Sequence, residues 1–109
     1  MHWLWIVSYF FGGAFLANAI PHTVSGLMGR PFQSPFAKPP GEGLSSSTVN
    51  VLWGFFNLVV SYVLVCDVGM FVSKNRADSI AFGAGFLVFG LLLARQFGRF
   101  HGGNRPDSP

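Results

Sequence analysis

Three long apolar stretches dominate the pattern of hydrophobic and polar positions along this chain. They cover residues 3–20, 49–66 and 80–97, with polar or proline-rich segments between them. A helix rises about 1.5 Å per residue, so roughly 18 residues reach about 27 Å, close to the hydrocarbon thickness of a bilayer. The pattern predicts an all-α membrane protein, a single membrane domain with transmembrane helices over residues 3–20, 48–67 and 79–97.

The composition favours the same class. Charged residues make up 10% of the 109 residues, whereas a soluble domain carries about 25%. The basic residues are scattered beside the apolar stretches, which is typical of topology signals, so we expect no nucleic-acid partner. Three spans bury only a small interface, and we therefore expect membrane lipids and either a homo-oligomer or a larger membrane complex as partners.

The first stretch was compared with a signal peptide, because Ala17-Asn18-Ala19 has the small-x-small spacing of a cleavage site. No Lys or Arg precedes the stretch, and it is longer than the usual apolar region of a signal. We expect it to be retained as the first transmembrane helix.

The distribution of basic residues predicts the orientation. Lys and Arg in short loops stay on the cytoplasmic side. With three spans, the linker between the first two spans lies on the same side as the tail of residues 98–109. This side, together with the end of the third span, holds Arg30, Lys38, Arg95, Arg99 and Arg105, whereas the opposite side holds Lys74 and Arg76. We expect a multi-pass protein of the cell inner membrane with its N-terminus outside and its C-terminus in the cytoplasm.

The linker of residues 21–47 is rich in proline and glycine, which disfavour a long helix. It also carries the repeated Pro-Phe of Pro31-Phe32 and Pro35-Phe36, which gives it apolar character. Long loops without structure are uncommon unless they are functional or disordered. We expect an ordered loop that lies at the interface and caps the bundle; a flexible connector and a re-entrant hairpin are the alternatives.

Small and polar residues recur at helical spacing on each predicted helix, as expected of faces that pack against protein. In hydrocarbon, an amide needs a hydrogen-bond partner, and small residues let two backbones approach closely. The predicted packing stripe comprises Ser8, Gly12, Gly54, Asn57, Ser61, Ala81, Gly85, Gly90 and Ala94.

Polar groups are expected to converge at the cytoplasmic end of the bundle. A basic, amide-lined pocket there is suited to an anionic lipid headgroup or to a carboxylate or phosphate ligand. The alternative for Arg95 is that its side chain reaches the water from a helix end. The candidate ligand or lipid-headgroup residues are Asn18, His22, Arg30, Asn50, Arg95, Gln96 and His101.

Catalytic and cofactor chemistry finds little support in the chain. His22 and His101 fall on one side, but no carboxylate cluster or haem-attachment motif accompanies them, so we expect no metal and no cofactor. No nucleophile with a base at recognisable spacing appears, and an enzyme is the less favoured interpretation.

The run Asn18-Ala19-Ile20-Pro21-His22, with Gly26, Gly29-Arg30-Pro31-Phe32 and the segment of residues 34–41, resembles small bacterial inner-membrane proteins of unassigned function. The resemblance implies a bacterial setting and no particular activity.

The favoured function is that of an accessory or structural subunit that packs against itself or a larger membrane complex. An oligomeric pore or carrier is one alternative, with Asn57 and Ser61 facing a shared lumen. A lipid-binding protein or a membrane-embedded enzyme that uses the cytoplasmic-side polar cluster is the other.

Overall fold

The computed structural model describes residues 2–107 and contains three long helices. Helix α1 spans His2–Leu27, α2 spans Ser47–Tyr62 and continues as a π-helical turn over Val63–Asp67, and α3 spans Arg76–His101. All three are long and apolar enough to cross a membrane. The expectation of a mostly helical chain with three such helices is confirmed.

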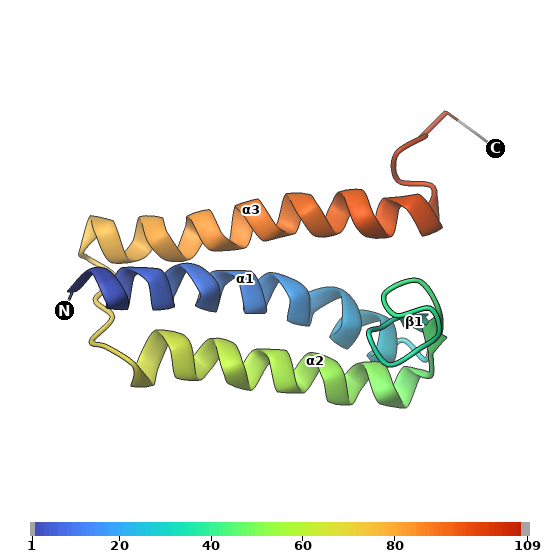
Figure 1. Ribbon diagram of the computed structural model, residues 1–109, viewed down its shortest axis with the longest axis horizontal. Coiled ribbons are helices and arrows are strands. Elements are labelled where there is room, and N and C mark those ends of the chain that lie inside the picture. The colour runs from blue at the N-terminus through green and yellow to red at the C-terminus, as the bar shows by residue number, and fades with distance from the viewer. Residues whose placement is uncertain (1, 108–109) are drawn as a thin grey trace.

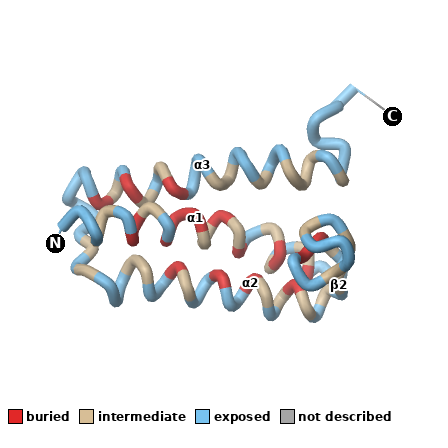
Figure 2. Tube along the Cα trace, in the orientation of Figure 1, coloured by how far each residue is buried: buried red, intermediate tan, exposed pale blue. Residues whose placement is uncertain are grey.

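Helix α1 lies between α2 and α3 and packs against both (Figure 1). Buried residues follow α1 along most of its length, whereas those of α3 are confined to its first half (Figure 2). Large apolar side chains on the outer faces of α2 and α3 are exposed. The core is therefore a pair of seams on opposite sides of α1.

Glycines set the closeness of the two seams. A Cβ added at Gly54 of α2 would meet the backbone and side chain of Thr23, and one added at Gly85 of α3 would overlap the backbone of Phe10. On α1 itself, a Cβ at Gly13 would overlap the carbonyl of Phe82. Such contacts let helix backbones approach each other, which is how helices associate when no hydrophobic effect drives them together.

Helix α1 is longer than the apolar pattern predicts, since residues 21–27, expected in the linker, continue it. Pro21 lies inside the helix and supplies no N–H to the carbonyl four residues earlier. The helix continues because its last turns pack on α2: His22 and Gly26 are buried, and Gly26 lies against Ser47 and Val51. Packing here outweighs the local preference of proline.

The segment between α1 and α2, termed loop 28–46, folds back on itself. Strands β1 (Phe32–Gln33) and β2 (Leu44–Ser45) pair in antiparallel register, with Phe32 opposite Ser45. The Gly41 N–H donates to the Ser34 carbonyl over 2.8 Å. The loop lies at the end of the bundle where α1 ends and α2 begins, termed here the loop end (Figure 1).

Different residues cap α2 and α3. Ser46 caps α2 by accepting from the Val49 N–H. Asn75 caps α3 by accepting from the Ala77 N–H, because the helix begins earlier than the apolar stretch. Asp78 is buried and accepts instead from the Val72 N–H over 3.1 Å, with the His2 imidazole 3.5 Å away.

Replacing Asp78 by alanine is expected to lower the free energy of unfolding by about 1–3 kcal/mol, because the Val72 N–H loses its acceptor. The measurement is a denaturation curve in mixed micelles followed by circular dichroism. Asp67→Ala is the control, because Asp67 is exposed, and surface changes of this kind stay within about 0.5 kcal/mol. Equal midpoints for the two variants would contradict the assigned role of Asp78.

Candidate functional site

A ladder of side-chain hydrogen bonds joins α1 to α2. The Ser8 hydroxyl donates to the Leu64 carbonyl over 2.6 Å, and the Ser61 hydroxyl donates to the Gly12 carbonyl over 2.7 Å. Further along, the Asn18 amide donates to the Asn57 side-chain oxygen over 3.0 Å. Ser8, Asn57 and Ser61 of the predicted packing stripe thus form hydrogen bonds between α1 and α2 within one chain.

The last rung of the ladder connects His22 to Asn50 and to loop 28–46. Both side chains are buried, and the His22 Nδ1 lies 2.7 Å from the Asn50 oxygen. The Asn50 amide nitrogen lies 3.0–3.2 Å from the carbonyls of Phe32, Ser45 and Ser46, so its two N–H groups are shared among three acceptors. One asparagine therefore holds both short strands of the loop against the start of α2.

Aromatic rings join the loop to the end of α3. Phe32 lies between the helices: its ring is 4.7 Å from that of Phe97, meets the His22 imidazole edge-on at 5.4 Å and stacks on the His101 imidazole at 5.1 Å. The His101 Nε2 lies 2.7 Å from the buried Gln33 side-chain oxygen. Two histidines from different helices thus contact one loop residue, and each has an amide partner of its own.

A small polar hollow of about 200 Å³ opens between the helices at the loop end. Asn18 and His22 line it from α1, Trp53 from α2 and Gln96 from α3, and Gln33 and Ser34 of the loop lie beside them. Among residues 2–107, the indole N–H of Trp53 is one of three buried side-chain polar atoms without a hydrogen-bond partner. The hollow is therefore rich in neutral hydrogen-bonding groups.

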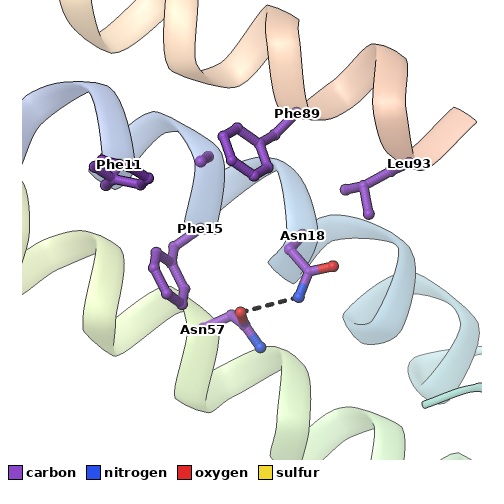
Figure 3. Close-up of a pocket in the computed structure, with 7 residues that line it drawn as sticks. Phe11, Phe15, Asn18, Asn57, Phe89 and Leu93 are labelled. Carbon is purple, nitrogen blue, oxygen red and sulfur yellow. Dashed lines mark hydrogen bonds between the residues drawn. The ribbon is translucent and has the colours of Figure 1, made fainter. Parts of the chain in front are cut away.

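An apolar groove of about 380 Å³ runs along α1 and meets this hollow at Asn18. Phe11, Ala14 and Phe15 line it from α1, while Phe89 and Leu93 line it from α3. Figure 3 shows the hydrogen bond between Asn18 and Asn57 at one end of the groove, with the rings of Phe15 and Phe89 beside it. The groove is lined mostly by apolar residues, whereas most residues around the loop-end hollow are of polar type, although much of the surface they present is apolar.

The residues expected to form an anion site are only partly brought together. Asn18, His22, Asn50, Gln96 and His101 gather around loop 28–46, through the contacts given above. The two arginines lie elsewhere: both are exposed, and neither lines the polar hollow. Arg30 lies with His101 along a separate surface hollow, and the Arg95 backbone carbonyl accepts from Asn104.

The packing-stripe residues divide into two groups. Ser8, Gly12, Gly54, Asn57, Ser61, Ala81 and Gly85 are buried. Gly90 and Ala94 instead line a shallow hollow where α3 diverges from α1. Because α3 diverges there, its second half reaches α1 through large side chains, as Phe97 does where its ring meets the His22 imidazole at 5.8 Å.

Gln33, Ser34 and Trp53 were absent from the sequence-based site. Trp53 lies one turn from both Asn50 and Asn57, so the helical period of α2 carried a usable signal for it. Gln33 and Ser34 lie inside the Pro-Phe repeat, where no periodicity relates them to distant residues. Only the folding of the loop brings them to the hollow.

The chain matches no family model, no curated protein and no solved structure. Function is therefore inferred from the geometry of these residues alone.

Proposed function

We propose that the protein spans a bacterial inner membrane three times, with its N-terminus outside and its C-terminus in the cytoplasm. The length and apolar character of the three helices support the insertion. The loop and the end of α3 lie at the same end of the bundle (Figure 1), so their basic residues share one side, as positively charged loops do in the cytoplasm.

The function that the geometry supports best is that of an accessory or structural subunit, which docks on another membrane helix through α3. The observation that carries this proposal is a partly exposed stripe of α3 around Gly83 and Gly90, where an added Cβ would meet no atom within 4 Å. Leu87 and Ala94 belong to the same stripe, since the positions are spaced by four, three and four residues. No residue of this chain packs closely enough on the two positions to require a glycine there. Both glycines therefore suit the close approach of a further helix.

The pore or carrier alternative receives less support. Asn57 and Ser61, its expected lumen residues, are buried, and both are hydrogen-bonded to α1. Exposing them to a shared lumen would break the ladder that joins α1 to α2. The buried polar groups of α2 serve to fold a single chain.

Replacing Gly83 and Gly90 together by leucine is expected to weaken the assembly at least about tenfold, equivalent to 1.4 kcal/mol. The new side chains separate the partner helix from α3 and meet nothing in their own chain. The measurement is native mass spectrometry after mild detergent extraction from the native membrane. Foreign subunits identify a larger complex, and multiples of the chain mass identify a homo-oligomer; both support docking.

The matched control is Val88→Leu, which enlarges an exposed side chain on another face of α3. It is expected to retain the assembly. A wild-type protein that leaves the membrane as a lone chain contradicts the proposal, and so does a double-leucine variant that keeps the wild-type assembly.

A further inference from the structure

The apolar groove and the polar hollow lie on either side of Asn18, which lines both. The groove extends along α1 from Phe11 to Asn18, about 10 Å at the rise of a helix. Of the residues that the structure describes, none that lines either hollow carries a permanent charge. Such a surface suits a molecule with an apolar chain and a small uncharged head.

The hydrogen bonds around Asn18 determine which of its atoms is open to a ligand. The Asn57 amide nitrogen donates to the Trp53 carbonyl over 2.7 Å, and a carbonyl only accepts. The Asn57 oxygen must then be the acceptor facing Asn18, so Asn18 donates with its nitrogen. The Asn18 oxygen keeps no partner among the hydrogen bonds of residues 2–107, and Figure 3 shows it pointing away from Asn57 toward the side of Leu93.

A second unsatisfied group lies beside the same hollow. Trp53 lines it, and the indole N–H is buried without a partner. The Asn18 oxygen is not among the buried unpaired atoms of residues 2–107, so it stays accessible to a ligand, whereas the indole N–H is covered by the fold. A hydroxyl group suits the Asn18 oxygen, because it can donate a hydrogen bond to it.

We propose that the groove binds an uncharged, hydroxyl-bearing lipid of the membrane. Its chain lies along Phe15 and Phe89, and its hydroxyl donates to the Asn18 oxygen and lies near the Trp53 indole. Phosphate or ammonium headgroups are excluded from the hollow because a charge there would lose its hydration without an opposite charge to compensate. This ligand site lies between the helices and is separate from the docking face of α3.

The test uses the full-length chain in detergent micelles, with Trp3 and Trp5 replaced by phenylalanine so that Trp53 alone fluoresces. The probe is a long-chain alcohol brominated beside its hydroxyl carbon, because bromine quenches a nearby indole. The matched probe is the brominated alkane of the same length, which lacks the hydroxyl. We expect the alcohol to quench Trp53 saturably at concentrations about threefold to tenfold below those of the alkane, the range of one hydrogen bond.

Two substitutions locate the site. Ala14→Leu places a larger side chain in the groove and is expected to abolish saturable quenching, whereas Ala17→Leu enlarges a residue that lines the separate hollow beside α3 and is expected to preserve it. Circular dichroism verifies that each variant is folded. Equal quenching by the alcohol and the alkane overturns the proposal, and this comparison needs neither alanine variant. Undiminished quenching of a folded Ala14→Leu variant also overturns it.

Discussion

Replacing Gly85 by leucine is expected to separate α3 from α1 and to lower the free energy of unfolding by roughly 3 kcal/mol or more. A Cβ at this position overlaps the carbonyl and Cα of Phe10, which are backbone atoms that no rotamer change can move. The seam is also close at Gly13 of α1, where an added Cβ would overlap the Phe82 carbonyl. The measurement is the denaturation midpoint in mixed micelles, followed by circular dichroism.

The control for Gly85→Leu is Gly83→Leu, two residues earlier on the same helix. The added side chain meets nothing in its own chain, so the stability of the isolated chain is expected to remain within about 0.5 kcal/mol. The pair separates packing within the chain from docking on a partner. A midpoint for Gly85→Leu equal to that of Gly83→Leu would show that the seam between α1 and α3 is not closely packed.

Replacing Asn50 by leucine is expected to destabilise the fold by about 2–4 kcal/mol and to release loop 28–46. The change removes the donor to the Phe32, Ser45 and Ser46 carbonyls and also leaves the His22 imidazole without its amide partner. Leucine has nearly the same size, so the loss comes from unpaired polar groups and not from a cavity. Hydrogen exchange of the loop amides, read beside the denaturation midpoint, measures both effects.

Asn104→Leu serves as the matched control for Asn50→Leu. Asn104 is exposed and makes a single side-chain hydrogen bond, to the Arg95 carbonyl. Its replacement is expected to cost at most about 0.5 kcal/mol and to leave loop exchange unchanged. Slow exchange at the Gly41 and Gly43 amides in Asn50→Leu would mean that the loop is held by its aromatic contacts instead.

Hydropathy was sufficient to locate the three helices, because the hydrocarbon layer requires about twenty apolar residues with internally paired backbones. The polar stripe of α2 was equally visible, since Gly54, Asn57 and Ser61 recur at helical spacing. The pattern did not show which helix packs against this stripe. The structure assigns it to α1, through bonds such as that from Ser61 to Gly12.

The end of α1 shows where local preference is a poor guide. Proline favours termination by removing one backbone hydrogen bond, yet the helix continues to Leu27. The tertiary contacts of Gly26 with Ser47 and Val51 decide the outcome, and they connect residues more than twenty positions apart. No window of neighbouring residues carries that information.

By itself, then, the sequence determined the number of helices, their apolar faces and the convergence of Asn18, His22 and Asn50 at one end, because these depend on length and helical period. Only the tertiary structure decided that α1 lies between the other two helices, that Gln33 meets His101, and that Arg30 and Arg95 stay outside the polar hollow. The reason is that such contacts depend on how the loop folds and where α3 diverges from α1. Neither can be read from the residues that surround each position in the chain.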